Sequence, residues 1–152
     1  MALLLPDALA AEGIKGTAEV ERLAVGDVTW EVEGVRYFVE RKAMTPESDD
    51  FSKSFYSGRL ARQCRAMKQD GRGAVLVEGR WVVGPAGLMY DPESGLMLSA
   101  HAKAPLTARH LDAILLRLQF EGLVTWVTRD LNHTAWAVAK LLWMSLRRSR
   151  WL

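Results

Sequence analysis

The sequence predicts one α/β domain of three layers, in which helices flank a central mixed β-sheet. Strand and helix patterns alternate in the second half of the chain. Residues 74–79 (AVLVEG) form a near-continuous apolar run, which is typical of a buried parallel strand. Of the 152 residues, 49% are hydrophobic and 25% are charged, as in ordinary globular domains. We therefore expect a single domain over residues 1–152.

Strands dominate the expected structure of the first half. A short helix or turn is expected over residues 6–13. Alternation with a period of two predicts strands over 18–25, 29–32 and 35–41. The dipeptide at 26–27 ends the first of these strands, and Glu33-Gly34 supplies a hairpin turn between the other two. The polar segment 43–54 is expected to be a loop that leads into a helix.

Helices dominate the expected structure of the second half. They are predicted over 57–68, 107–121 and about 132–148. Thr107 is suited to cap the second of these helices, and a short apolar strand over 123–128 follows it. Residues 81–99 contain several Gly and Pro turn signals and predict a hairpin or an irregular insert.

The composition argues against several protein classes. No apolar run reaches the roughly 18 residues that a membrane span needs, so we expect no membrane association. The N-terminal apolar residues lack a preceding basic region, which argues against a secretory signal. Cys64 is the only cysteine, so no disulfide framework forms within the chain, and the three histidines lack zinc-ligand spacing. We expect an intracellular protein, located in the cytoplasm or nucleoid, or in the cytoplasm of a host cell.

Charge is distributed unevenly along the chain. Residues 1–52 hold eleven Asp or Glu and five Lys or Arg, whereas residues 53–72 hold six Lys or Arg and one Asp. An acidic block followed by a basic block suggests carboxylates beside a surface that binds a polyanion. A solvated helix with uneven charge fits the same pattern.

The acidic block contains a group of residues suited to metal-assisted hydrolysis. Because side chains alternate along a strand, Glu40 and Lys42 point to one side and Arg41 to the other. Asp27 lies at the mouth of the preceding turn, so two carboxylates meet at one end of the sheet, where they can hold Mg²⁺. A surface strand with a salt bridge would have the same pattern. Glu78, at the end of the apolar strand, is a candidate supporting residue.

The basic block places a row of cations on the helix predicted at 57–68. The apolar side chains of Leu60, Cys64 and Met67 share one face of this helix. The opposite face carries basic residues spaced by three, which are Arg59, Arg62, Arg65 and Lys68. Such a row can neutralise the phosphates of a nucleic-acid backbone.

Several motifs in order resemble a known family. They are Gly26-Asp27, the triplet Glu40-Arg41-Lys42, Gly58-Arg59 with Gln63, the strand VLVEG and the helix that starts Asn132-His133-Thr134-Ala135. Together they resemble the nuclease domain of the XPF/MUS-type structure-specific endonucleases, of the restriction-endonuclease-like superfamily. The resemblance covers roughly residues 18–145.

The resemblance implies a Mg²⁺-dependent DNA endonuclease, with Mn²⁺ as a substitute, that cuts flaps, splayed arms or four-way junctions. It implies that Asp27 and Glu40 are metal ligands, that Lys42 is the catalytic lysine and that Arg41 is its partner arginine. Arg59 and Gln63 match the positions of the family on the helix beside the active site. DNA would be bound by Arg59, Arg62, Gln63, Arg65 and Lys68.

The sequence departs from the family pattern in three ways. The family has an Asp four residues after the lysine, where this chain has Pro46. Keeping register with Phe51 makes Asp50, rather than Glu47 or Asp49, the expected substitute. The acid of the first family strand has only Asp7 as a counterpart, which we expect as a further metal ligand. No helix-hairpin-helix or helicase domain is expected within the chain.

Two alternatives stay open. The chain could be a catalytically inactive DNA-binding partner subunit of a nuclease complex, although Asp27, Glu40, Arg41 and Lys42 are all present. It could also be a Holliday-junction resolvase of the same superfamily. In each case we expect DNA as the partner, together with a homodimer formed through the last two helices and the strand between them. Alternatively, the N-terminal residues 1–11 cover this surface within one chain. Trp136 and Trp143 lie on nearly one face of the last helix.

Overall fold

A computed structural model describes residues 5–11, 27–100 and 105–147. Its α-helices are α1 (Leu5–Ala11), α2 (Asp50–Tyr56), α3 (Arg59–Asp70), α4 (Ala108–Phe120) and α5 (Leu131–Leu146). Its strands are β1 (Val28–Val32), β2 (Val35–Ala43), β3 (Arg72–Glu78), β4 (Val82–Val83), β5 (Met89–Tyr90) and β6 (Val124–Thr128). A single 3₁₀ turn, η1 (Pro85–Gly87), separates β4 from β5.

The main sheet has four described strands in the order β1-β2-β3-β6. β1 pairs with β2 in antiparallel orientation, whereas β2 with β3 and β3 with β6 are parallel. The register pairs Ala43 with Glu78 and Glu78 with Thr128. The carboxyl ends of β2, β3 and β6 therefore lie at one edge of the sheet, which is where sites form in such sheets.

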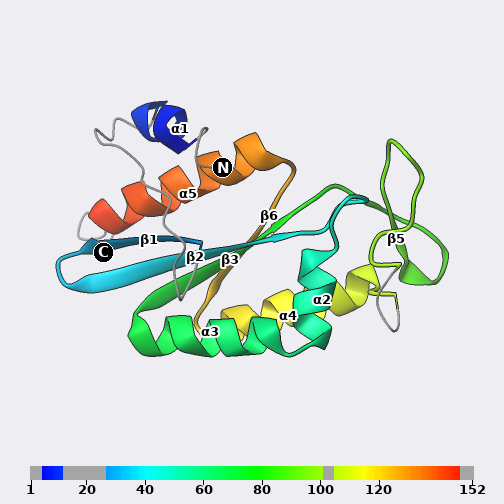
Figure 1. The fold of residues 1–152 in the computed structure, drawn as a ribbon, viewed down its shortest axis with the longest axis horizontal. Helices are drawn as coiled ribbons and strands as arrows, with labels where there is room; N and C mark the ends of the chain where they lie inside the picture. Colours follow the sequence, from blue (N-terminus) through cyan, green and yellow to red (C-terminus); the bar gives the residue numbers. More distant parts are fainter. Residues whose placement is uncertain (1–4, 12–26, 101–104, 148–152) are drawn as a thin grey trace.

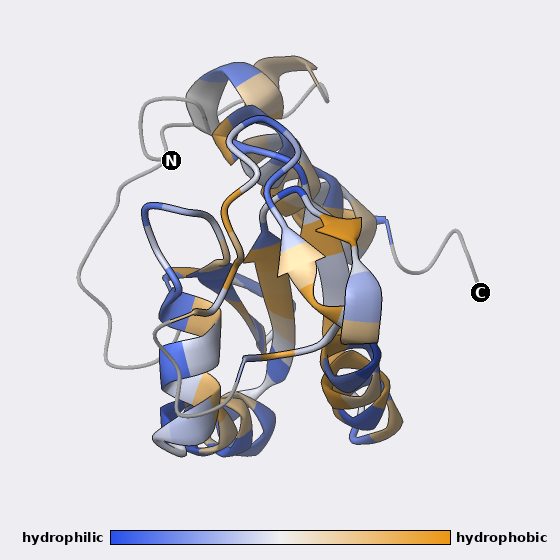
Figure 2. Ribbon diagram, turned by 90° about the vertical axis from the view of Figure 1, so that its right-hand side faces the viewer, coloured by the Kyte–Doolittle hydropathy of each residue, from blue (hydrophilic) through white to orange (hydrophobic). Residues whose placement is uncertain are grey.

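Helices cover both faces of this sheet (Figure 1). α5, with α1 packed against it, lies on one face, and α2, α3 and α4 lie on the other. The strands carry mainly hydrophobic colours in Figure 2, whereas the helices show both hydrophobic and hydrophilic segments. Each face has its own core, one around Phe51, Met67 and Val77 and the other around Val39, Leu76 and Val138. The predicted α/β class with a mixed sheet is confirmed.

Several predicted elements are confirmed in detail. The hairpin turns at Glu33 and Gly34, which have φ values of 50° and 80°. Positive φ at both positions matches the twist of the strands that the turn joins. Thr107 caps α4, because its side chain accepts a hydrogen bond from the backbone N–H of His110. The strand predicted over 18–25 lies outside the described residues.

The segment 43–54, expected to be a loop that leads into a helix, contains the start of α2 at Asp50, as predicted. One boundary differs from the prediction. The helix predicted from residue 57 begins at Arg59, because Gly58 has a φ of 78° and separates α2 from α3. A left-handed residue cannot continue a helix, and glycine adopts this conformation without the usual steric cost. The insert at 81–99 is a small hairpin of β4 and β5.

Candidate active site

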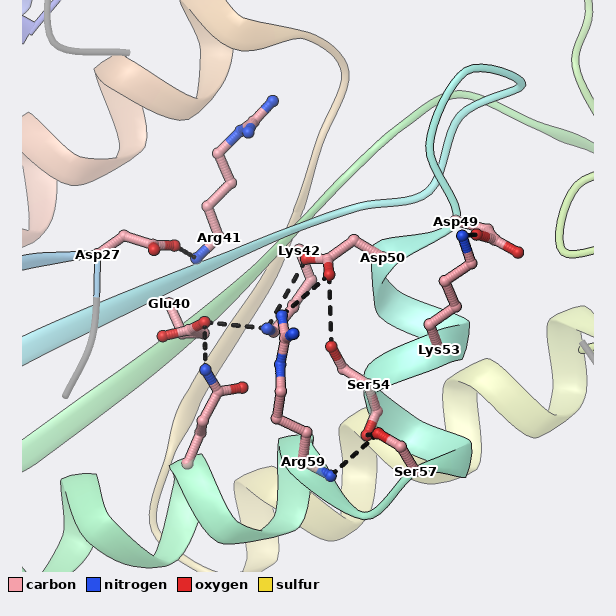
Figure 3. Close-up of polar contacts among 11 residues, drawn as sticks. Asp27, Glu40, Arg41, Lys42, Asp49, Asp50, Lys53, Ser54, Ser57 and Arg59 are labelled. Atoms are coloured by element: carbon pink, nitrogen blue, oxygen red, sulfur yellow. Dashed lines mark hydrogen bonds and ion pairs between the residues drawn. The ribbon is translucent and has the colours of Figure 1, made fainter. Parts of the chain in front are cut away.

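A buried ion pair forms the centre of the candidate site (Figure 3). Both of its members belong to β2, and the pair lies between this strand and α3. The Nζ atom of Lys42 lies 2.9 Å from Oε1 of Glu40, and both side chains are almost inaccessible to solvent. The same Oε1 atom accepts a hydrogen bond of 2.8 Å from Nε2 of Gln63. The strand alternation thus brings Glu40 and Lys42 to one face, as predicted, and α3 supplies the third partner.

The environment of Glu40 disfavours its charged form. Burial raises the pKa of the Glu40 carboxyl above its ordinary value, and the nearby negative charge of Asp27 raises it further. The bonds from Lys42 and Gln63 act in the opposite direction but do not cancel these effects. Two carboxylates that repel each other at one sheet edge are suited to share a cation.

Asp27 is held at this edge by the backbone of β2. Its Oδ2 atom accepts a hydrogen bond of 2.7 Å from the N–H of Arg41, and the backbone N–H of Asp27 bonds to the carbonyl of Val39. The Asp27 side chain is exposed. The predicted meeting of Asp27 and Glu40 at the end of the hairpin therefore has a direct geometric cause.

Asp50 approaches the same lysine from α2. Its Oδ2 atom lies 3.7 Å from Nζ of Lys42, and its Oδ1 atom lies 3.1 Å from a guanidinium nitrogen of Arg59. Asp49 instead pairs with Lys53 at 3.2 Å, and Glu47 is exposed. Of the three acids considered in the sequence, Asp50 is the one that lies beside Lys42.

The side chain of Arg41 points away from those of Glu40 and Lys42, on the face of the sheet that α5 covers. Its guanidinium forms a two-bond pair with the Glu78 carboxylate, at 2.9 and 2.7 Å. Thr134 of α5 donates a third bond of 2.6 Å to Glu78, and Thr128 shares a bond with Thr134. This network joins the ends of β2, β3 and β6 to the first turn of α5.

The Glu78 carboxyl is ionised in this network. Burial would raise the pKa of Glu78, but the hydrogen bonds from Arg41 and Thr134 outweigh burial and hold it below the ordinary value. The sequence marked Glu78 as a strand-end acid and included Thr134 in a family motif, but it did not indicate that the two side chains are partners. A threonine 56 residues away in the sequence becomes a partner only when α5 packs on the sheet.

The basic residues predicted on α3 form an exposed row, which we call the α3 stripe. Its members are Arg59, Arg62, Arg65 and Lys68. Arg59 pairs with Asp50, and Lys68 pairs with Glu121 at 2.9 Å. Within the described parts of the chain, Arg62 and Arg65 have no ion pair. The stripe begins beside the buried Lys42–Glu40 pair, where Arg59 reaches Asp50.

Asp7 is not brought to this group. It lies exposed on α1, which packs against α5, whereas Glu40 and Lys42 face α2 and α3. The first turn of a helix replaces the strand position that the family pattern would need. Among residues 5–11, 27–100 and 105–147, no three His, Cys, Asp or Glu residues lie close enough to form a metal-binding cluster.

The donor set nevertheless fits a hard divalent cation held by few protein ligands. Lys42 and Gln63 both bind Oε1 of Glu40, and the Arg41 amide binds Oδ2 of Asp27. Each carboxylate therefore has a second oxygen outside these bonds. Mg²⁺ prefers carboxylate oxygens and keeps several waters, so one or two carboxylates suffice.

Comparison with known proteins identifies the family. The ERCC4 domain profile matches residues 4–141. The chain belongs to the ERCC4 domain family. The XPF/MUS-type resemblance inferred from Asp27, Glu40-Arg41-Lys42 and Gln63 is therefore confirmed at the level of the family. A search of curated protein sequences finds no match to this ERCC4 domain.

Two solved structures have the same fold as this ERCC4 domain. XPF from Aeropyrum pernix is 22% identical, with a TM-score of 0.54 over 96% of this chain and 59% of that chain. XPF from Aeropyrum pernix in complex with DNA is 24% identical, with a TM-score of 0.52 over 96% of this chain and 58% of that chain. The chain thus spans about three-fifths of these proteins. No helix in the described ranges has the length and apolar character of a membrane span.

Proposed function

We propose that this ERCC4 domain is a Mg²⁺-dependent DNA endonuclease that hydrolyses phosphodiester bonds in branched DNA. The observation that carries the proposal is the buried Lys42–Glu40 pair, with Asp27 and Asp50 at the same sheet edge. A buried charge pair costs stability unless it is well bonded, so an ordinary surface strand has little reason to contain one. A catalytic site would explain the pair, because it needs a lysine held beside carboxylates in spite of that cost.

The side chains have distinct roles in this proposal. Asp27 and Glu40 would hold Mg²⁺, which when bound would neutralise charge on the scissile phosphate. Lys42 donates to a phosphate oxygen and stabilises the charge that develops there. Gln63 orients Glu40, and the pair of Asp50 with Arg59 restrains Lys42 from the α2 side. The Arg41–Glu78 pair fixes the end of β2 from the opposite face.

DNA contacts are assigned to the α3 stripe. Arg62 and Arg65 are exposed cations beside the site, and a duplex carries a dense row of phosphates that such side chains neutralise. The XPF structure solved with DNA supports nucleic acid as the partner. An intracellular site of action follows from a DNA substrate.

The decisive experiment is cleavage of end-labelled flaps, splayed arms, four-way junctions and plain duplex, with Mg²⁺, with Mn²⁺ and with EDTA. We expect cleavage near the branch point with either metal and none with EDTA. Glu40→Gln and Asp27→Asn should each reduce the rate on the order of 10²-fold or more while DNA binding persists. Glu31→Gln, an exposed acid of β1, is the matched control. Full activity of Glu40→Gln would contradict the mechanism.

We further propose a homodimer through α4, β6 and α5. Several exposed apolar side chains lie on these elements. We call five of them the apolar patch, namely Leu116, Phe120, Val124, Trp126 and Met144. Phe120 is 91% exposed and Trp126 is 57% exposed. A groove of about 650 Å³ between the main sheet and the C-terminal part of α5 adjoins the patch, lined in part by Val124 and Met144. Such a surface is typical of an interface.

Light scattering tests the dimer. The wild-type protein should have the mass of two chains at micromolar concentration, and Phe120→Glu or Trp126→Glu should have the mass of one. Val82→Glu, which places the same charge on an exposed apolar position of β4, is the control and should leave the mass unchanged. A wild-type mass of one chain, with junction cleavage intact, would refute the dimer.

A further inference from the structure

α5 carries a row of alternating aromatic and basic side chains that the proposed active site does not use. We call it the α5 stripe, and its members are His133, Trp136, Lys140, Trp143 and Arg147. Their spacings alternate between three and four residues, so they share one face of the helix. The buried side chains of Ala135 and Val138 lie on the other side, against the sheet. The stripe therefore faces away from the core.

The members of the α5 stripe contact one another in sequence. The rings of His133 and Trp136 have centroids 5.6 Å apart. The Lys140 ammonium lies 5.9 Å from the Trp136 ring centroid and 5.3 Å from that of Trp143, and Arg147 lies 5.5 Å from Trp143. Cations at these distances interact favourably with ring faces. These contacts arrange the rings and charges as one continuous surface.

The charged members of the α5 stripe are all basic. α5 contains no Asp or Glu, and the sequence after it continues with Arg148 and Arg150. A second copy of the chain placed over the stripe itself, rather than over the apolar patch, would remove Lys140 and Arg147 from water, which is costly for charged groups. An anionic partner with flat apolar groups would instead match both the basic and the aromatic side chains of the stripe. Trp136 itself is 44% exposed.

The position of the stripe connects it with the candidate active site. Thr134, beside His133 in the first turn of α5, bonds to Glu78, which holds Arg41 at the end of β2. From that edge the stripe extends for about 21 Å along α5, at 1.5 Å per residue. It lies on the sheet face opposite to the α3 stripe (Figure 1). The two stripes thus begin at the same edge of the sheet and extend along its opposite faces.

We propose that the α5 stripe binds the single-stranded arm of a branched DNA, while the α3 stripe binds the duplex. Bases stack on the Trp136 and Trp143 rings, and Lys140 and Arg147 pair with phosphates, which is how sequence-tolerant single-strand sites work. The branch point then lies at the edge that carries Lys42. The inference rests on the proposed nuclease function for its choice of DNA substrate.

Binding measured in EDTA, where cleavage is excluded, tests the inference. The probes are a fluorescent oligothymidylate and a blunt duplex. Trp136→Ala should weaken oligothymidylate binding about tenfold, or about 1.4 kcal/mol, and leave duplex binding unchanged. Trp136→Phe should retain most of the affinity because it keeps a ring. Lys140→Ala should reduce the salt slope for oligothymidylate by about 0.7.

A matched control and the oligomeric state complete the test. Arg109→Ala removes an exposed cation from α4, outside both stripes, and should leave both probes unaffected. Equal losses for duplex and oligothymidylate, no loss in Trp136→Ala, or conversion of a dimer to single chains by Trp136→Ala would overturn the inference. If the wild type cleaves no DNA but binds oligothymidylate through Trp136, the nuclease proposal fails and the single-strand surface stands.

Discussion

The Lys42 ammonium lies 2.9 Å from Oε1 of Glu40 at a position where the lysine side chain is 1% exposed. If either side chain were removed, water could not solvate the charge that remains. Removing one member of a buried pair is strongly destabilising, whereas replacing both members is often tolerated. The pair therefore makes activity and stability depend on the same two side chains.

Lys42→Met should abolish cleavage and lower the free energy of unfolding by about 3 kcal/mol, because it leaves Glu40 buried without its cation. Urea denaturation of wild type, Lys42→Met, Glu40→Gln and the double variant measures both single effects and their coupling. The double variant should be more stable than Lys42→Met. Additive losses would mean that the two side chains do not depend on each other.

Asp50→Asn should reduce the cleavage rate about 10- to 100-fold, because its carboxylate restrains Lys42 and Arg59 beside the site. Asp49→Asn and Glu47→Gln are the controls, since neither side chain reaches Lys42. Rates under single-turnover conditions compare the three variants. A loss in Glu47→Gln without a loss in Asp50→Asn would show that the assumed register of the acidic site is wrong.

Arg62→Ala combined with Arg65→Ala should reduce the slope of log K against log salt for duplex binding by about two. Each arginine is expected to neutralise one phosphate. Fluorescence anisotropy across a salt series measures the slope, with Lys53→Ala as a control for an exposed cation of α2. An unchanged slope in the double variant would mean that the α3 stripe does not face the DNA.

Glu78→Gln should make stability less dependent on pH. The folded-state pKa of Glu78 lies below its ordinary value of 4.5, so its ionised form contributes stability above that value. This contribution is lost as the pH falls through the folded-state pKa. The stability difference between wild type and Glu78→Gln should thus be largest near about pH 7 and shrink in acid. A constant difference across that range would contradict the assignment.

Cys64 should resist alkylation in the folded protein. Burial raises the pKa of its thiol to about 11, and the reactive thiolate is therefore scarce at neutral pH. Because it is the only cysteine, a single mass increase after iodoacetamide treatment reports on it. The same treatment in urea is the control and should modify the chain fully. Equal rates in both conditions would show that Cys64 is accessible.

Much of the fold could be predicted from local sequence patterns. The Glu33-Gly34 turn, the Thr107 cap and the apolar strand ending at Glu78 are signals that lie within a few residues of the structure they specify. The alternation along β2 likewise predicted that Glu40 and Lys42 share a face. The start of a helix within residues 43–54 was predicted as well, whereas the break at Gly58 that separates α2 from α3 was not.

The rest of the site depends on packing between distant segments. No local pattern links Arg41 to Glu78 and Thr134, which meet only because β2, β3 and α5 are stacked. The exposure of Trp126 has a similar origin. Trp126 lies on β6, which has only one described neighbour in the sheet. Asp7 was predicted as a metal ligand by analogy with the first strand of the family, whereas it lies on the helix α1.

The parallel pairing of β2, β3 and β6 has a consequence for how the candidate site forms during folding. The bonds that complete the site join residues 37 and 56 positions apart, and a parallel sheet cannot form from neighbouring hairpins alone. Long-range pairing slows folding, since each loop must close before its contacts are made. A nascent chain in which α5 has not yet been synthesised therefore has the triplet Glu40-Arg41-Lys42 but not the structure that aligns it. Recovery of cleavage after dilution from urea should coincide with the last folding phase.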